Sequence, residues 1–180
     1  MAFNYKGSRN GAQRNLTEPI LIKTNEVVAV GDAVETYTTG TVENGTAALP
    51  IKGIVQSIVN ADGLPFVSGE HTAGSTNTSD TQSVTGDGTQ YCIIDTSPDT
   101  LYSAEVNGTL GTTNSSDKLG CRLDVDSANT DYGRLLETTA TRTVVTTANF
   151  YSHGVDPEDS TRLIVSLFNS EEYTGQSTEA

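Results

Sequence analysis

The chain has 180 residues, enough for one domain that buries a substantial core without disulfides or metals. Its net charge is −13, which argues against nucleic acid as a partner, because binding phosphates requires clustered cations. No apolar run approaches the about 20 residues that span a membrane, and no apolar stretch follows Lys6 and Arg9, so we expect neither a membrane span nor a secretory signal.

The charge is unevenly distributed along the chain. Residues 1–17 contain no acidic residue and three basic ones, Lys6, Arg9 and Arg14, whereas the rest of the chain holds all 23 acidic residues. The segment shows neither helical nor strand periodicity, and Phe3 and Tyr5 are its aromatic anchors. Two interpretations stay open: a frayed terminus, or a flexible basic arm that becomes ordered on a partner.

Short runs of β-branched and apolar residues, separated by Gly, Asn and Asp, predict an all-β domain. The expected strands are residues 20–22, 27–30, 33–38, 53–59, 91–96, 101–106, 119–125, 133–137, 143–151 and 162–168. No segment has the pattern of an amphipathic helix. We therefore predict a single compact β-barrel or β-sandwich over residues 18–170, followed by an acidic tail over residues 171–180.

The most regular signal lies in the middle of the chain. Tyr91–Thr96 and Leu101–Val106 are joined by a Ser-Pro-Asp-Thr turn and are predicted to form a central hairpin. In the second run Tyr102, Ala104 and Val106 share one face. The last run, Arg162–Phe168, is nearly apolar on both faces, which predicts a strand in the interior of a sheet.

Residues 68–90 differ from the rest of the chain. They consist almost entirely of Gly, Ser, Thr, Asn and Asp, with one large aliphatic residue, Val84. Such a segment buries little apolar surface, so we expect a long exposed loop, with room for an edge hairpin and for a contact surface.

None of the sequence patterns formed by the acidic residues, histidines and cysteines indicates an active site. Asp124–Leu135 resembles a calcium-binding loop, but Gly is missing from its sixth position and Glu from its twelfth, so an acidic turn is the favoured interpretation. His71 and His153 have no metal-ligand spacing and are predicted to be surface histidines. We expect Cys92 and Cys121 to be reduced and buried, with a disulfide between them left open. No metal or cofactor is expected.

Four segments together carry a resemblance to a known family. These are the strand ending at Gly31-Asp32, then YCIIDTSPDTLYSAEVNGTL, GCRLDVDSANTDYGRLLE and FYSHGVDPEDSTRLIVSLF. In this order they resemble small capsid decoration (cement) proteins of tailed bacteriophages. The resemblance covers most of residues 19–168 but does not include the polar loop over residues 68–90.

This resemblance implies a non-enzymatic protein that sits on the outer surface of the virion, often as a homotrimer. Its partner would be the major capsid protein, and it would stabilise the shell. The charge asymmetry adds a hypothesis about the site, in which the basic arm reaches the capsid through Phe3, Tyr5, Lys6, Arg9 and Arg14. The alternative is a carbohydrate-binding or adhesin-type β-sandwich on a virion, which the absence of Trp disfavours.

Overall fold

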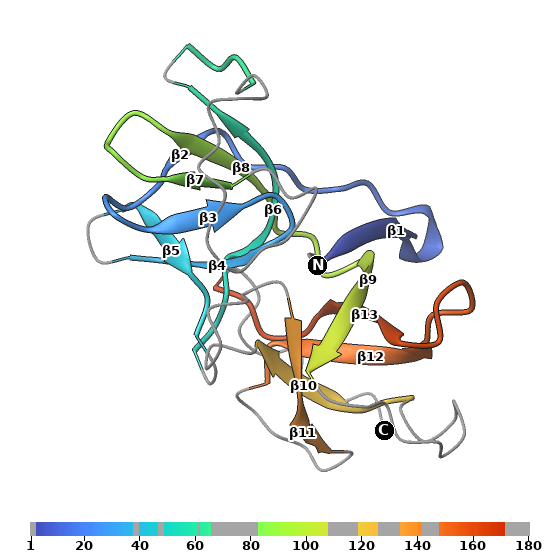
Figure 1. Ribbon diagram of the computed structural model, residues 1–180. Helices are drawn as coiled ribbons and strands as arrows, with labels where there is room; N and C mark the ends of the chain where they lie inside the picture. The colour runs from blue at the N-terminus through green and yellow to red at the C-terminus, as the bar shows by residue number, and fades with distance from the viewer. Residues whose placement is uncertain are drawn as a thin grey trace.

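The computed structural model describes residues 3–37, 40–46, 49–60, 62–65, 83–107, 119–125, 134–141 and 148–171. These residues form strands β1–β13 and one short 3-10 turn, η1 (Arg9–Gly11), with no α-helix among them. The all-β prediction is therefore confirmed. The strands are arranged in two main sheets that lie next to each other (Figure 1), an arrangement compatible with a β-sandwich domain.

The five-stranded sheet has the strand order β2-β8-β6-β4-β5, and every pairing in it is antiparallel. Its strands are β2 (Ile20–Leu21), β8 (Tyr91–Asp95), β6 (Gly53–Val59), β4 (Ala33–Thr36) and β5 (Val42–Asn44). A small separate sheet joins β3 (Val27–Ala29) to β7 (Ser83–Thr85). Strand β7 lies within the segment predicted as a polar loop, while residues 66–82 lie outside the described residues.

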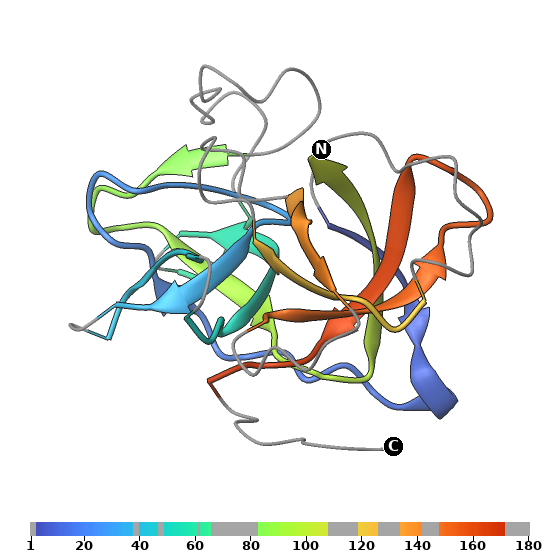
Figure 2. The same ribbon diagram turned by 90° about the horizontal axis from the view of Figure 1, so that it is seen from below.

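The six-stranded sheet has the order β1-β9-β11-β10-β12-β13. Its strands are β1 (Asn4–Ser8), β9 (Thr100–Asn107), β11 (Arg134–Thr141), β10 (Arg122–Val125), β12 (Phe150–Val155) and β13 (Arg162–Leu167). Strand β9 pairs with β13 along one edge and with β1 and then β11 along the other, so the sheet curls around its own apolar side chains. Figure 2 shows this curled sheet beside the five-stranded one.

Strand β13 has a partner on each side, β12 and β9, which confirms its predicted interior position. Leu163 and Val165 are fully buried, whereas Ile164 is only partly buried. The predicted alternation along β9 is also confirmed, because Tyr102, Ala104 and Val106 are all buried.

The two sheets enclose separate apolar clusters. The cluster under the five-stranded sheet is entirely aliphatic apart from one cysteine: Ile22, Val28, Val34, Val42, Val55, Ile58, Cys92 and Ile94. The second cluster lies mainly on the six-stranded sheet but also includes Ala33 of β4 and Ile54 of β6, and it contains three aromatic rings, those of Phe3, Tyr102 and Phe150. Both Cys92 and Cys121 are buried, as expected, and no disulfide joins them.

The predicted central hairpin is wrong in one respect, because β8 and β9 do not pair with each other. Strand β8 belongs to the five-stranded sheet and β9 to the six-stranded sheet. The turn between them is held by Asp95, whose side chain accepts hydrogen bonds from the Ser97 amide and the Thr100 hydroxyl. This turn redirects the chain from one sheet to the other.

The end of the described chain is also more ordered than predicted. Ser170 bridges to Ile51, and the Glu171 amide donates to the Ile51 carbonyl. The Glu171 side chain accepts from the Thr36 amide and hydroxyl and lies 3.8 Å from the Lys52 ammonium. The first residue of the acidic tail, Glu171, is therefore bound to the five-stranded sheet. Residues 172–180 lie outside the described residues.

Candidate functional site

The N-terminal segment, residues 3–17, lies along both sheets. Strand β1 pairs antiparallel with β9, from Asn4 opposite Ser103 to Ser8 opposite Thr100. Farther along, the Thr17 amide donates to the Ile94 carbonyl, and the Thr96 amide donates to the Asn15 carbonyl. The prediction of a detached, flexible arm is therefore corrected, because these residues contribute a strand to the folded domain.

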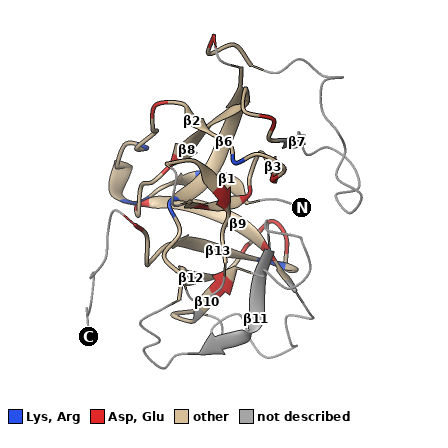
Figure 3. Ribbon diagram, turned by 90° about the vertical axis from the view of Figure 1, so that its left-hand side faces the viewer, with Lys and Arg blue, Asp and Glu red and all other residues tan. Residues whose placement is uncertain are grey.

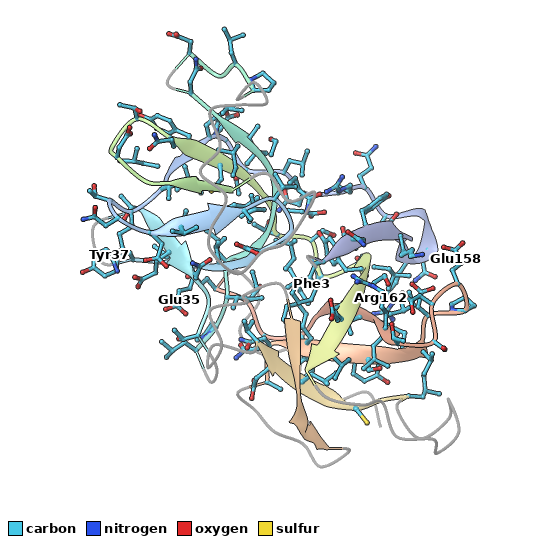
Figure 4. All side chains as sticks on the ribbon, in the orientation of Figure 1. Phe3, Glu35, Tyr37, Glu158 and Arg162 are labelled. Atoms are coloured by element: carbon cyan, nitrogen blue, oxygen red, sulfur yellow. The ribbon has the colours of Figure 1, made fainter. Side chains whose placement is uncertain are left out.

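Phe3 lies at the start of this segment and is only 4% exposed. Its ring stacks on that of Phe150, with centroids 4.8 Å apart, and meets the ring of Tyr102 edge-on at 6.3 Å. Figure 4 places Phe3 next to β1, near the boundary between the two sheets. A core position explains the aromatic residue, and it means that Phe3 is not displayed as the surface anchor that we predicted.

Asp95 is the fully buried centre of a polar network that links the N-terminal segment to both sheets. One of its carboxylate oxygens accepts from Arg14 Nε at 2.8 Å, from the Tyr102 hydroxyl at 2.9 Å and from the Thr100 hydroxyl at 3.0 Å. Burial and the nearby Asp95 charge both raise the pKa of Tyr102, so its hydroxyl remains a donor. The buried carboxylate is thus compensated by one cation and two hydroxyl donors.

Arg14 joins this network to the surface. Its guanidinium also donates to the Gln56 side chain on β6, and it lies over the Tyr5 ring with 4.5 Å between its central carbon and the ring centroid. Tyr5 is 48% exposed and Leu16 is 50% exposed. We call Tyr5, Arg14 and Leu16 the N-terminal contact surface, since the exposed Tyr5 ring lies against a fixed guanidinium and the exposed Leu16 follows Arg14 two residues later.

Lys6 is bound to the body of the domain. Its ammonium lies 3.2 Å from Asp156 and is also paired with Glu158, both in the turn between β12 and β13. Figure 4 shows Glu158 beside the N-terminal segment. Hydrogen bonds to Glu158 and Asp156 raise the pKa of Lys6. Two of the three predicted capsid-binding cations, Lys6 and Arg14, therefore hold the segment onto the domain.

Arg9 is the third of these cations. It is exposed at the end of β1 and forms no ion pair within the part of the chain that the structure describes. Its backbone amide donates to the Asp99 carbonyl at 2.7 Å. Acidic residues lie on loops and strands of both sheets (Figure 3), so Arg9 is an exposed cation on an acidic molecule.

Sequence reasoning placed Tyr5 and Arg14 in the site but did not assign Leu16 or Asp95 to it. Leu16 is predicted to be an apolar anchor of the N-terminal segment, together with Phe3 and Tyr5, but nothing in the sequence indicates that it is exposed on an ordered segment. Asp95 did carry a signal, because a carboxylate at the end of the apolar strand YCIID must find partners if it is buried. The sequence does not reveal that one partner is Arg14.

A second polar pair lies on the six-stranded sheet. His153 occupies a β-bulge in β12, and its Nε2 atom lies 2.9 Å from the Ser166 hydroxyl on β13. Ser166 is only 2% exposed, and the described residues show no hydrogen bond between His153 and a carboxylate. This pair is therefore a structural contact between two strands, and His153 is half-buried rather than on the surface as predicted.

The described residues bring together no group of three or more His, Cys, Asp or Glu side chains that could hold a metal ion. Asp124 is described and buried, but the rest of the sequence resembling a calcium loop lies largely outside the described residues, as does His71. In the described ranges there is also no helix of the length and apolarity needed to cross a membrane.

Comparisons with known proteins identify no relative. No family model matches the chain, and neither the curated proteins nor the solved structures contain a match. The functional argument therefore depends on the residues themselves.

Proposed function

We propose that this protein is a non-enzymatic structural protein that binds the outside of an assembled viral capsid and stabilises it. The resemblance of its central and C-terminal segments to phage decoration proteins supports this proposal, as does an all-β domain. Under this proposal the major capsid protein is the partner, the protein is a homotrimer, and its location is the outer surface of the virion.

The observation that carries the proposal is the N-terminal contact surface. Tyr and Arg are enriched among the residues that dominate binding energy at protein interfaces. Tyr5 and Arg14 are stacked here, and Arg14 is held by the buried Asp95. Because these side chains are ordered before any partner binds, less conformational entropy is lost on binding.

Deletion of the N-terminal segment is not a suitable test of this proposal. Deleting residues 1–17 would remove β1 and the core residue Phe3, so lost binding would be indistinguishable from lost folding. Point changes of exposed side chains avoid this problem. The appropriate variant is Tyr5→Ser combined with Leu16→Ser, which alters the contact surface and leaves Phe3 in place.

The matched control is Leu64→Ser combined with Leu119→Ser, since these leucines are 61% and 53% exposed and lie outside the N-terminal segment. Each protein is added to shells assembled without it, and occupancy is measured by quantitative mass spectrometry. We expect the contact-surface variant to bind at least about tenfold more weakly, which corresponds to about 1.4 kcal/mol, and the control to bind like wild type.

Arg9→Glu provides a separate test of electrostatics. An exposed charge acts over a screening length of about 8 Å at physiological ionic strength. We therefore expect this variant to bind shells more weakly at low salt, with a smaller difference from wild type at high salt.

Full occupancy by the contact-surface variant would place the capsid contact elsewhere. Absence of wild-type binding to shells, together with binding to immobilised glycans, would instead favour the carbohydrate-binding alternative, in which Tyr5 would stack on a sugar ring.

A further inference from the structure

The N-terminal segment is attached to the domain in two separately anchored parts. The outer part, residues 3–9, contacts the six-stranded sheet through β1, Phe3 and Lys6. The inner part, residues 14–17, is bound to the edge of β8. Apart from the hydrogen bonds within η1, the described residues show one backbone hydrogen bond for Asn10–Gln13, from the Ala12 amide to the Arg9 carbonyl at 2.9 Å.

The link between the two parts turns the chain through left-handed backbone conformations. Asn10 has φ 54° and Gly11 has φ 69°. Glycine adopts this region without strain, but for Asn it is less favourable than an extended conformation. Converting the turn to an extended chain would release this strain and would break the hydrogen bond from Ala12 to Arg9.

The outer part carries a self-contained set of contacts that another copy of the chain could receive. Its partners are β9 for the strand, Phe150 and Tyr102 for the Phe3 ring, and the turn at Asp156 and Glu158 for Lys6. The Phe3 amide also donates to the Gly31 carbonyl, the Arg9 amide donates to the Asp99 carbonyl, and the Tyr5 ring lies against Arg14 of the inner part. A receiving copy that supplies all of these partners, its own Arg14 included, can make the same contacts between two chains, as strand exchange requires.

We propose that copies of this chain exchange residues 3–9, so that β1 of one copy pairs with β9 of another. The inner part stays on its own β8, because Arg14, Asn15 and Thr17 all bind there. The four residues of the link span up to about 14 Å when extended, which sets how closely the neighbouring copy must lie. The occupant of the β9 edge is thus a second copy of the same chain.

This exchange is heterologous, since the donated strand and the receiving edge are different surfaces. A heterologous contact closes into a ring when the rotation between copies permits it. The inference does not depend on capsid binding, and it concerns the protein alone in solution.

The experiment uses a disulfide across the β1–β9 pair. Asn4 and Ser103 are directly opposite each other, and such pairs have Cα separations of about 4.5–5.5 Å, within the range that a disulfide spans. The variant carrying Asn4→Cys and Ser103→Cys is oxidised at micromolar concentration, then run on a denaturing gel without reductant. Each single-cysteine variant serves as a control, since the native Cys92 and Cys121 are buried.

We expect covalently linked oligomers, because exchanged strands place the two new cysteines on different chains. A second variant lengthens the link by inserting Gly-Ser-Gly-Ser after Gly11. We expect this variant to form intrachain disulfides and to be monomeric by light scattering, because a longer link closes easily onto its own body. A third variant, lacking Gly11 and Ala12, removes the turn and should increase the oligomer fraction.

A wild-type link that yields only intrachain disulfides would overturn the proposal, whether the protein is a monomer or an oligomer. The double-cysteine variant and the variant with the lengthened link test the exchange even if the variant with the shortened link does not fold. Capsid binding is not measured in this assay, so the exchange and the proposed function can fail independently.

Discussion

The five-stranded and six-stranded sheets build their apolar cores in different ways. The cluster under the five-stranded sheet draws all its residues from one continuous stretch between Ile22 and Ile94, and it is made of Val, Ile and a Cys. The cluster that lies mainly on the six-stranded sheet combines residues from Phe3 to Leu167, includes Ala33 and Ile54 of the five-stranded sheet, and contains three aromatic rings. One core is thus aliphatic and drawn from a narrower part of the chain, and the other is partly aromatic and drawn from both sheets.

This difference has a physical basis. The β-branched side chains of Val and Ile suit the pleated surface of a sheet, and they make up most of the cluster under the five-stranded sheet. A sheet that curls around its own interior leaves a wider space, and larger rings fill it. The N-terminal segment supplies one of these rings, so the six-stranded region depends on residues at the far end of the chain.

The largest effect is expected from Val165→Asp in β13. Val165 is fully buried, and an unpaired charge there should cost several kcal/mol, enough to remove most of the folded, soluble protein. Solubility and hydrogen exchange would reveal whether the five-stranded sheet persists alone. If the five-stranded sheet persists, the two regions fold independently of each other. A melting curve like that of wild type would instead contradict the burial of β13.

Phe3→Ala tests whether the six-stranded core needs the N-terminal segment. Removing a buried aromatic ring costs about 3–5 kcal/mol, and we expect chemical denaturation to show a loss of this size. Tyr5→Ala on the same strand is the control, since it loses mainly a surface cation–π contact worth about 1 kcal/mol. Equal effects of the two changes would mean that Phe3 does not complete the core.

Asp95→Asn tests the network that joins the two regions. The change keeps the shape of the side chain but removes the charge that binds Arg14, and we expect a loss of about 2–3 kcal/mol. Arg14→Met is the partner change for a double-mutant cycle. Because the two groups are in contact, their effects should not add, and strict additivity in urea unfolding would argue against the network.

The smallest effect concerns pH. Burial lowers the pKa of His153 below its ordinary value of 6.5, and the positive charge of Arg9 lowers it further. The unfolded chain therefore binds a proton more readily, so the contribution of His153 to stability is lost as the pH falls below about 6.5. His153→Gln should reduce the slope of stability against pH in that window. An unchanged slope would show that His153 does not contribute to the dependence of stability on pH.

Local features of the fold were predictable from the sequence. The strand predicted over residues 53–59 coincides with β6, because a run of β-formers ends at a cluster of turn residues. The interior position of β13 follows from apolar residues on both faces. These predictions succeeded because the signal and its cause lie within a few neighbouring residues.

Long-range features were not predictable. Strand β1, with sequence NYKGS, has no β pattern of its own and is a strand because β9 offers an edge to it. For the same reason, the cations of the segment appeared free, although Lys6 and Arg14 pair with acids far along the chain. The strand predicted over residues 143–151 lies largely outside the described residues, and its last two residues are the first two of β12, which continues through a bulge at His153.

The pairing of β1 with β9 also determines the order in which the chain can fold during synthesis. Residues 4–8 are made before their partner strand, which follows about a hundred residues later, and Phe150 follows about 150 residues after Phe3. At roughly 5–20 residues per second, the ribosome needs about 10–30 s to complete these contacts. Throughout this interval β1 is made but unpaired. Neighbouring ribosomes on one message therefore present an unpaired β1 close to the newly made β9 of another chain, so the origin of any exchanged assembly can be sought at translation.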